Sequence, residues 1–201
     1  MSKKEKQGTV QTQASKVITG KCRASYANLN EPKSINGGKP KYSVSIIIPK
    51  SDIDTLNKIR SAIKAAYVEG EHKLKGKAKT APPMNSLKCP LRDGDTARPD
   101  DEAYADSYFI NANSDTAPGI IDRNRQPITD TREIYSGIYA RFSVNFYAYN
   151  TNGNIGIACG LNNVQKLSDG TPLGGRSKAE DDFSDEFEYG DGDDSDLDFL
   201  G

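Results

Sequence analysis

Aromatic and guanidinium side chains occupy alternate positions in a central stretch of the sequence. Between residues 139 and 149, alternate positions carry three tyrosines and an arginine, namely Tyr139, Arg141, Tyr147 and Tyr149. Alternate residues of a β-strand point to the same side, so these side chains would share one face. With glycines predicted opposite them, they would form a surface that a flat ligand could approach closely. A tyrosine opposite a strand glycine also often just covers exposed backbone, and that alternative stays open.

Basic side chains recur elsewhere in patterns that suit contact with phosphate. The segment after Glu71 holds a lysine at every second position, at Lys73, Lys75, Lys77 and Lys79. In an extended chain all four ammonium groups would point one way, which fits tracking along a phosphate backbone. Four arginines lie on predicted connections, where such contacts are common: Arg92, Arg98, Arg123 and Arg125. A solvated polar loop would explain the same residues.

The sequence indicates neither a cofactor, nor a metal centre, nor a catalytic triad. Its cysteines lack metal-ligand spacing and are expected to be reduced structural thiols: Cys22, Cys89 and Cys159. The single histidine, His72, lies among lysines. An acid cluster at residues 93–102 could serve a metal-dependent nuclease, but arginines interrupt it and such clusters are usually solvated turns. We therefore expect a binding protein rather than an enzyme.

The stretch that positions the tyrosines is predicted to be a β-hairpin. Its even positions form an apolar face at strict period two: Ile138, Ala140, Phe142, Val144, Phe146 and Ala148. Asn152-Gly153 is the preferred central pair of a type I′ turn and sets the register. The core pairs are then Ala148 with Ile157, Phe146 with Cys159, and Val144 with Leu161. The outer pairs are Tyr149 with Gly156 and Asn145 with Gly160.

The remaining elements are predicted to be short strands and one helix. Strands are expected at 17–29, 42–48 and 104–113, with a turn at Asn36-Gly37-Gly38 and a hairpin at 118–128 that carries Arg123 and Arg125 near its tip. A helix opens at Ser51, which forms a capping-box-like pair with Asp54, and it ends at Gly70. Its apolar stripe is expected to pack on the core: Ile53, Leu56, Ile59, Ile63 and Ala66.

Charge divides the chain of 201 residues into two parts. All 27 basic residues precede residue 180, together with 17 acidic residues, whereas residues 180–201 hold the other 11 acidic residues. A body of net +10 joined to a tail of net −11 is typical of a nucleic-acid-binding protein with an acidic interaction tail. We expect a flexible arm at 1–16, one domain at 17–179 and a disordered tail at 180–201. Without an apolar run that suits a membrane span or a signal peptide, the protein is expected to be soluble and intracellular.

Four segments together carry a resemblance to a known family. They are PKYSVSIIIPKSD at 40–52, LRDGD and RPDDEAY within 91–104, YFINANS at 108–114, and the run that begins GIACGLNNVQKL at 156–176. From about Val17 to Asp182, the chain resembles a family of single-stranded DNA-binding proteins from phages and prophages of Gram-positive bacteria. That family is related in plan to the replication proteins of short-tailed phages.

The resemblance implies a mainly β fold, an OB-like five-stranded barrel with one principal α-helix and long loops. It also implies a protein that coats single-stranded DNA without sequence specificity in replication or recombination, in the cytoplasm of the bacterial host. The tyrosines, lysines and arginines above would then hold bases and phosphates. In short-tailed-phage relatives an acidic tail recruits replication enzymes. The corresponding segment here is Asp196, Leu197, Asp198, Phe199 and Leu200.

The sequence leaves two other functions open. The chain could be an interaction adaptor whose basic body simply holds its own acidic tail, and DNA binding after tail deletion would separate the two. The nuclease interpretation would require magnesium-dependent loss of DNA. Homo-oligomerisation, for instance as a dimer, is left open by the sequence.

Overall fold

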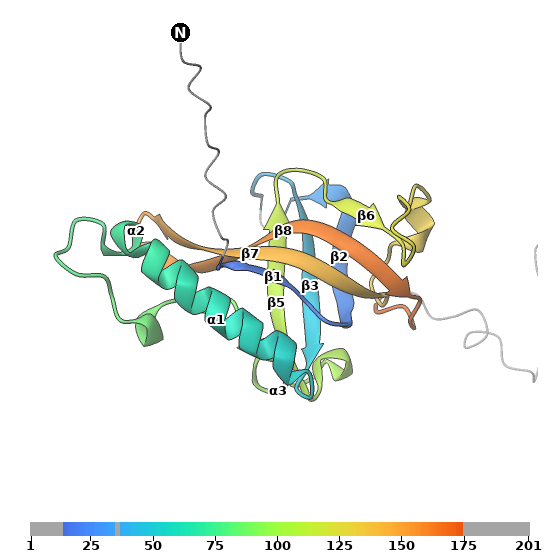
Figure 1. Cartoon of the computed structure of the whole chain (residues 1–201), viewed down its shortest axis with the longest axis horizontal. Coiled ribbons are helices and arrows are strands. Elements are labelled where there is room, and N and C mark those ends of the chain that lie inside the picture. The colour runs from blue at the N-terminus through green and yellow to red at the C-terminus, as the bar shows by residue number, and fades with distance from the viewer. Residues whose placement is uncertain (1–13, 35–36, 175–201) are drawn as a thin grey trace, which may run out of the picture.

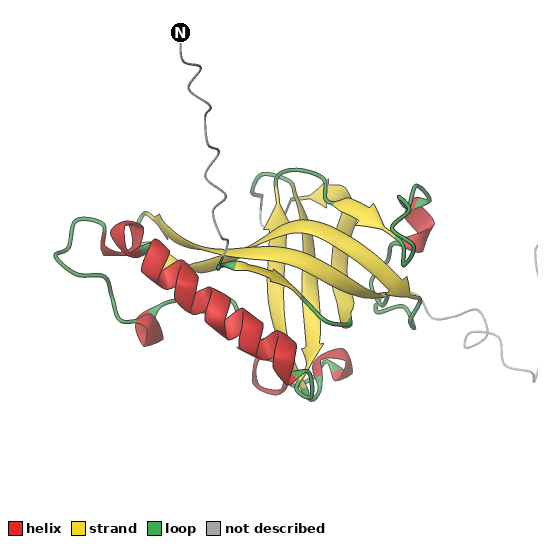
Figure 2. Cartoon of the chain, in the orientation of Figure 1, coloured by secondary structure: helices red, strands yellow, loops and turns green. Residues whose placement is uncertain are grey.

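A computed structural model describes residues 14–34 and 37–174 of the chain (Figure 1). The strands are β1 (Lys16–Ile18), β2 (Cys22–Lys33), β3 (Lys41–Pro49), β4 (Arg92–Asp93), β5 (Ser107–Ser114), β6 (Gly119–Ile121), β7 (Tyr139–Thr151) and β8 (Asn154–Ser168). The helices are α1 (Ile53–Glu69), α2 (Glu71–Lys75) and α3 (Gly94–Ala97), with 3₁₀ turns at Met84–Ser86, Glu102–Tyr104 and Thr131–Glu133. Figure 2 shows one long helix beside a body of strands, as predicted. No helix within the described ranges is both long and apolar enough to cross a bilayer.

Five of the strands close into a barrel. Antiparallel pairs join β7 to β2, β2 to β3 and β3 to β5, a parallel pair joins β5 to β8, and the long antiparallel pair of β8 with β7 completes the circuit. Strands β1, β4 and β6 extend the sheet beside β7, β5 and β8 respectively. Apolar side chains such as Ile46, Ile110 and Phe142 fill the interior and are fully buried. The predicted mainly β, five-stranded OB-like plan is confirmed.

The hairpin of β7 and β8 has the predicted register from the turn to the pair of Val144 with Leu161, beyond which the pairing shifts. All the core pairs and outer pairs expected from the turn are formed. Asn152 and Gly153 have φ values of 51° and 84°, as a type I′ turn requires. The even residues from 138 to 148 are all buried. At its turn end the hairpin reaches past the barrel towards α2 (Figure 1).

Helix α1 lies diagonally across one side of the barrel, in contact with β1 and β7 (Figure 1). Its N-cap is Asp52, whose carboxylate accepts the Thr55 N–H at 3.1 Å, so the prediction that Ser51 caps the helix was wrong. The other four residues of the predicted stripe are buried, but Ile53 is 56% exposed. At 3.6 residues per turn Ile53 lies about 100° from the centre of that stripe, which explains its exposure.

Two predicted strands have different bounds. The strand expected at 17–29 is interrupted at residues 19–21, where the pairing with β7 shifts by one residue between β1 and β2 and the Thr19 hydroxyl accepts the Phe142 N–H at 3.0 Å. The strand expected at 104–113 begins only at Ser107. Tyr104 lies in a 3₁₀ turn, where its ring is buried and its hydroxyl donates to Ser45 Oγ at 2.9 Å.

The three cysteines differ in exposure. Cys22 and Cys159 are buried in the core, and burial raises the pKa of the Cys22 thiol to about 12. Burial likewise raises the pKa of Cys159. Cys89 is a free cysteine but exposed, so the expected structural role was wrong there. Its segment between Pro83 and Arg92 is an irregular connection on the surface, which the sequence did not distinguish from core.

Candidate nucleic-acid interface

A groove of about 800 Å³ crosses the outer face of β2, β3 and β5. Its floor consists of uncharged polar side chains that the strand register places side by side: Asn28, Ser43, Ser45, Asn111 and Asn113. Its rim carries the cations Lys33, Lys39, Lys41 and Arg98. Cations clustered around a concave surface attract a polyanionic chain.

This groove continues over β8 towards the hairpin. A hollow of about 480 Å³ shares Asn111 and Asn113 with it, and is also lined by Lys88, Arg92 and Tyr149. The two hollows therefore form one continuous surface, which is called the groove below. An isolated β-bridge between Lys88 and Gly156 attaches the loop that carries Lys88 to strand β8.

Tyr147 lies beside the hairpin end of the groove. It shares one face of β7 with Tyr149, two residues away, and it is 39% exposed. Burial of the remainder raises the pKa of its hydroxyl. A further hollow of about 500 Å³ is lined by Tyr147 together with His72 and Lys73. The hairpin tyrosines thus connect the groove with the start of the lysine-rich segment.

Tyr26 marks the opposite end of the groove, on β2. The β2–β3 register shifts between Ser25 and Asn28, and within this bulge Tyr26 has a φ of 47°. A left-handed backbone costs a residue with a side chain about 1–2 kcal/mol. The bulge leaves the side chain 57% exposed, so the fold holds a strained tyrosine open to solvent. Strain retained at such a position motivates the hypothesis that Tyr26 contacts a ligand.

Arg98 holds Tyr26 in place. Its Nη1 donates to the Tyr26 hydroxyl at 3.2 Å, and its Cζ lies 4.9 Å from the centroid of the Tyr26 ring. The same guanidinium lies 4.7 Å from the centroid of the buried Tyr104 ring. Arg92 lies 4.5 Å from the Phe109 ring, which packs edge-on against Tyr104. One aromatic cluster therefore fixes both predicted arginines at the groove.

One carboxylate lies among the cations of the rim. Asp115 Oδ2 is 3.5 Å from Lys39 Nζ, and Asp115 Oδ1 is 3.7 Å from Lys41 Nζ. These side chains are well exposed, so the ion pairs contribute little to stability. An incoming phosphate could replace the carboxylate at both lysines.

Tyr139 and Arg141 are not part of the groove. They lie at the other end of β7, about 26 Å (Tyr139) and about 20 Å (Arg141) along the strand from Tyr147. A side chain at Gly170 would meet the Tyr139 ring, and Lys21 Nζ lies 4.5 Å from the centroid of that ring. Arg141 Nε donates to the Thr19 carbonyl at 3.1 Å. Both side chains contact other parts of the fold. The four side chains that were expected to form one surface therefore lie on two separate surfaces.

The lysine-rich segment is partly helical. Lys73 and Lys75 lie in α2, where successive side chains are about 100° apart, so the expected alignment of four ammonium groups was wrong. Lys73 lines the hollow beside Tyr147. Lys77 and Lys79 follow α2 and are exposed.

Arg123 and Arg125 lie at the tip of the predicted hairpin. The Ile128 N–H donates to the Ile120 carbonyl at 3.1 Å and closes this hairpin. Strand β6 pairs with β8 at residues 163–165, whereas the groove borders β8 at residues 157–159. The two arginines are exposed but belong to a different part of the barrel surface. The predicted partner-binding segment, Asp196 to Leu200, lies outside the described residues.

Sequence reasoning missed several residues of the groove. Tyr26 sits in a stretch that looks like an ordinary strand, and a bulge is not visible in the sequence. A signal was available for the floor, because Asn111 and Asn113 alternate with buried Ile110 and Ala112. The missed cations are Lys33, Lys39, Lys41 and Lys88.

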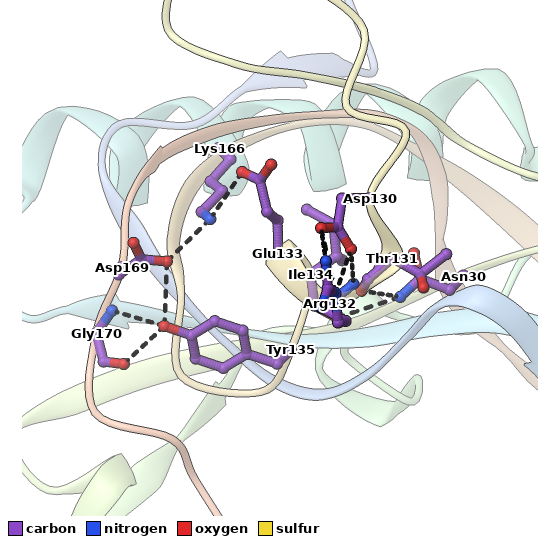
Figure 3. A network of polar contacts seen from close by, with 10 residues as sticks. All are labelled: Asn30, Asp130, Thr131, Arg132, Glu133, Ile134, Tyr135, Lys166, Asp169 and Gly170. Carbon is purple, nitrogen blue, oxygen red and sulfur yellow. Dashed lines mark hydrogen bonds and ion pairs between the residues drawn. The ribbon is translucent and has the colours of Figure 1, made fainter.

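A polar network fixes the segment 130–137, in which Ser136 borders the groove. Figure 3 shows this network at residues 130–135. Lys166 Nζ on β8 lies 3.3 Å from Glu133 Oε2 and 2.9 Å from Asp169 Oδ1. Burial lowers the pKa of Lys166, but its bonds to Asp169 and Glu133 outweigh that effect and raise the pKa. The Tyr135 hydroxyl bonds both Asp169 and the Gly170 carbonyl.

Ser136, within this segment, lines the groove and joins two other parts of the chain to it. Its Oγ accepts the Ala27 N–H at 2.9 Å, next to Tyr26. Its carbonyl accepts the Leu173 N–H at 2.8 Å. Asn30 Nδ2 secures the other flank by donating to the Thr131 and Ile134 carbonyls (Figure 3). The last described residues therefore run beside the groove.

The acid cluster at 93–102 is partly neutralised by Lys50. Its Nζ lies 2.6 Å from Asp95 Oδ2 and 3.0 Å from Asp93 Oδ2. These hydrogen bonds raise the pKa of Lys50, and the bond from Lys50 lowers the pKa of Asp95. Within the part of the chain that the structure describes, no three or more His, Cys, Asp or Glu side chains form a group that could hold a metal ion. The nuclease interpretation gains no support from this arrangement.

Comparison with known proteins defines the class to which this fold and groove belong. A family model described as the ssDNA-binding protein of Enterobacter phage Enc34 matches residues 15–196. The chain belongs to this family of phage single-stranded DNA-binding proteins. The chain is also 35% identical over 166 residues to protein p50 of Acyrthosiphon pisum secondary endosymbiont phage 1, a match that covers 80% of this chain and 87% of p50.

Solved structures show the same fold. The single-stranded DNA-binding protein from bacteriophage Enc34, in complex with ssDNA, matches with a TM-score of 0.67 and 27% identity over 81% of this chain and 91% of that one. The single-stranded DNA-binding protein gp2.5 of bacteriophage T7 matches with a TM-score of 0.56 and 18% identity over 87% and 95%, a likeness of fold. The predicted family is confirmed, and the association with Gram-positive hosts stays a prediction.

Proposed function

We propose that this chain binds single-stranded DNA in the groove without sequence specificity, and coats it during phage replication or recombination in the host cytoplasm. The arrangement that carries the proposal is a groove with cations along its rim, the exposed Tyr26 at one end, and Tyr149 with its exposed neighbour Tyr147 at the other. Sequence-tolerant binding needs a positive groove for phosphates and rings on which bases stack. The Enc34 protein of the same family has been solved with ssDNA, which supports the proposal.

The groove has room for a short run of nucleotides. Along the sheet under the groove, the path from Tyr26 on β2 to Tyr147 on β7 crosses β3, β5 and β8, which amounts to four strand spacings or about 19 Å. Single OB barrels cover about 4–16 nucleotides. We therefore expect a site near the lower end of that range for one molecule. Formation of a homodimer stays a prediction.

Titration with oligonucleotides of increasing length tests this function. Affinity for single strands should rise steeply with length until the groove is filled, and then level off. A duplex of equal length should bind more weakly, because its bases are paired and cannot stack on the tyrosines. Fluorescence anisotropy of end-labelled oligonucleotides measures both series. Equal affinity for duplex and single strand, or no dependence on length, would contradict the proposal.

A second part of the proposal concerns the acidic segment at 180–201. We propose that it competes with DNA for the groove and that Asp196 to Leu200 recruit a replication or recombination enzyme. Support comes from Leu173 and Ser136, whose hydrogen bond brings the chain to the groove just before this segment begins. Eleven carboxylates would offer the rim cations the same charge as a nucleic-acid backbone does.

Deletion of residues 180–201 should tighten single-strand binding. The gain should be largest at low salt, where screening of charges is weakest, and should shrink as salt is added. Anisotropy titrations of both proteins over a salt series measure it. Phe199→Ala is the matched control, since it keeps all eleven acidic residues and should leave DNA affinity unchanged while it abolishes capture of the enzyme. Equal affinities of the full-length and shortened chains at low salt would rule out competition.

A further inference from the structure

The floor of the groove carries a row of amide side chains with free hydrogen-bonding capacity. Register places Ser43 opposite Asn113 and Ser45 opposite Asn111, so both asparagines face outward from β5. Asn28 Nδ2 is bonded to Ser43 Oγ at 3.0 Å, and Ser45 Oγ accepts the Tyr104 hydroxyl. Among the described residues, neither the Asn111 nor the Asn113 side chain makes a hydrogen bond within the protein. Their amides are therefore available to a ligand.

Among the described residues, none gives the middle of the groove an aromatic surface for bases. The tyrosines that line it, Tyr26 and Tyr149, are at its two ends, and Asn111 and Asn113 lie between them in both of its hollows. Cations on the rim would hold the phosphates there, which leaves the bases to point towards the floor. Bases that reach the middle would thus meet amides rather than rings.

An amide suits the edge of an unpaired base. Each asparagine side chain presents an acceptor oxygen and two donor hydrogens. Every base edge likewise displays donors and acceptors, and these edges are free only when the strand is unpaired. Because the amide can offer either group, it can serve any of the four bases. Contacts of this kind require a hydrogen-bonding base without selecting its identity.

We propose that Asn111 and Asn113 bind the edges of unpaired bases. The protein would then recognise the hydrogen-bonding groups of the bases as well as the phosphates and the base rings. This inference rests on the proposed function, because it assumes that the single strand lies in the groove. It assigns the two asparagines a role that stacking and charge alone would not supply. Its consequence is that a base with the right shape but without hydrogen-bonding groups should bind poorly.

The test compares oligothymidylate with an oligonucleotide in which central thymines are replaced by difluorotoluene, which has the shape of thymine but only weak hydrogen-bonding capacity. The natural protein should prefer thymine by about two- to tenfold for each replaced base that meets an amide. The variant Asn111→Ala with Asn113→Ala should bind the two oligonucleotides equally. Asn57→Ala, on the exposed face of α1, is a matched control that should keep the full preference.

The binding results distinguish failure of the inference from failure of the proposed function. If the natural protein binds both oligonucleotides equally well, the inference fails while the proposed function stands. If it binds neither, the proposed function itself fails. Full preference for thymine in the double variant would show that other groups contact the bases and would overturn the inference. Should the double variant melt early, Asn111→Ala alone, at an exposed position, gives the same comparison with a smaller reduction of the preference.

Discussion

Replacing Tyr26 with glycine and Tyr147 with alanine in one chain should weaken single-strand binding by about 2–6 kcal/mol, or from roughly 30-fold to roughly 20,000-fold. Each stacked base contributes about 1–3 kcal/mol, and the two rings lie at opposite ends of the groove, so their effects should add. Anisotropy titrations of the natural protein, both single variants and the double variant measure the effect.

Glycine is chosen at residue 26 because it separates binding from stability. It tolerates the φ of 47° that strains tyrosine, so relief of strain offsets the removal of the interaction with Arg98. The melting temperature of Tyr26→Gly should stay within a few degrees of the natural value while affinity falls. Tyr139→Ala is the matched control, since that ring packs within the fold, and it should lower stability more than affinity. An unchanged affinity of Tyr26→Gly together with a large fall in melting temperature would make Tyr26 a structural residue.

Four lysines of the groove should dominate the salt dependence of binding. Changing Lys33, Lys39, Lys41 and Lys88 to glutamine should reduce the slope of log affinity against log salt by about 0.7 for each phosphate that is no longer neutralised, or about 2.8 if each lysine neutralises one phosphate. Affinity measured between low and moderate salt gives this slope directly. The change should be nearly independent of base composition, because phosphates are common to all sequences.

The lysine-rich segment supplies a comparison of equal charge. Glutamine at Lys73, Lys75, Lys77 and Lys79 removes the same four positive charges, but of these Lys73 lines the hollow beside Tyr147. We expect a change in slope of about 0.7, a quarter of that for the groove set. If the two sets change the slope equally, the strand continues along the lysine-rich segment. If the groove set has no effect, the groove is not the path of the phosphates.

Local pattern was sufficient to predict the hairpin but not the course of its long strand around the barrel. Alternation and the Asn152-Gly153 turn fix which residues of β7 and β8 are paired, because both signals are short-range. The same alternation places Tyr139 and Tyr147 on one side of the strand. Curvature depends on the pairing of β7 with β1 and β2 as well as with β8, which no local pattern records.

The groove was only partly predictable for a similar reason. Arg92 and Arg98 were predicted because they lie on an expected connection, but their position over Phe109 and Tyr104 depends on the fold of the 91–106 connection. Tyr26 depends on a bulge in β2, where a register shift between strands far apart in sequence decides which way the ring points. The alternation of Asn111 and Asn113 with apolar residues was visible in the sequence. An exposed amide does not by itself indicate a binding site, because that depends on which residues lie beside it.

The closed circuit of strands under the groove has a kinetic consequence. Most of the floor lies on paired strands, so little backbone has to be ordered when a ligand arrives. Association should therefore be limited by encounter and accelerated by the rim cations, with no slow rearrangement before it. Substitutions of the tyrosines and asparagines would then act on the lifetime of the complex, whereas substitutions of the lysines would also slow its formation.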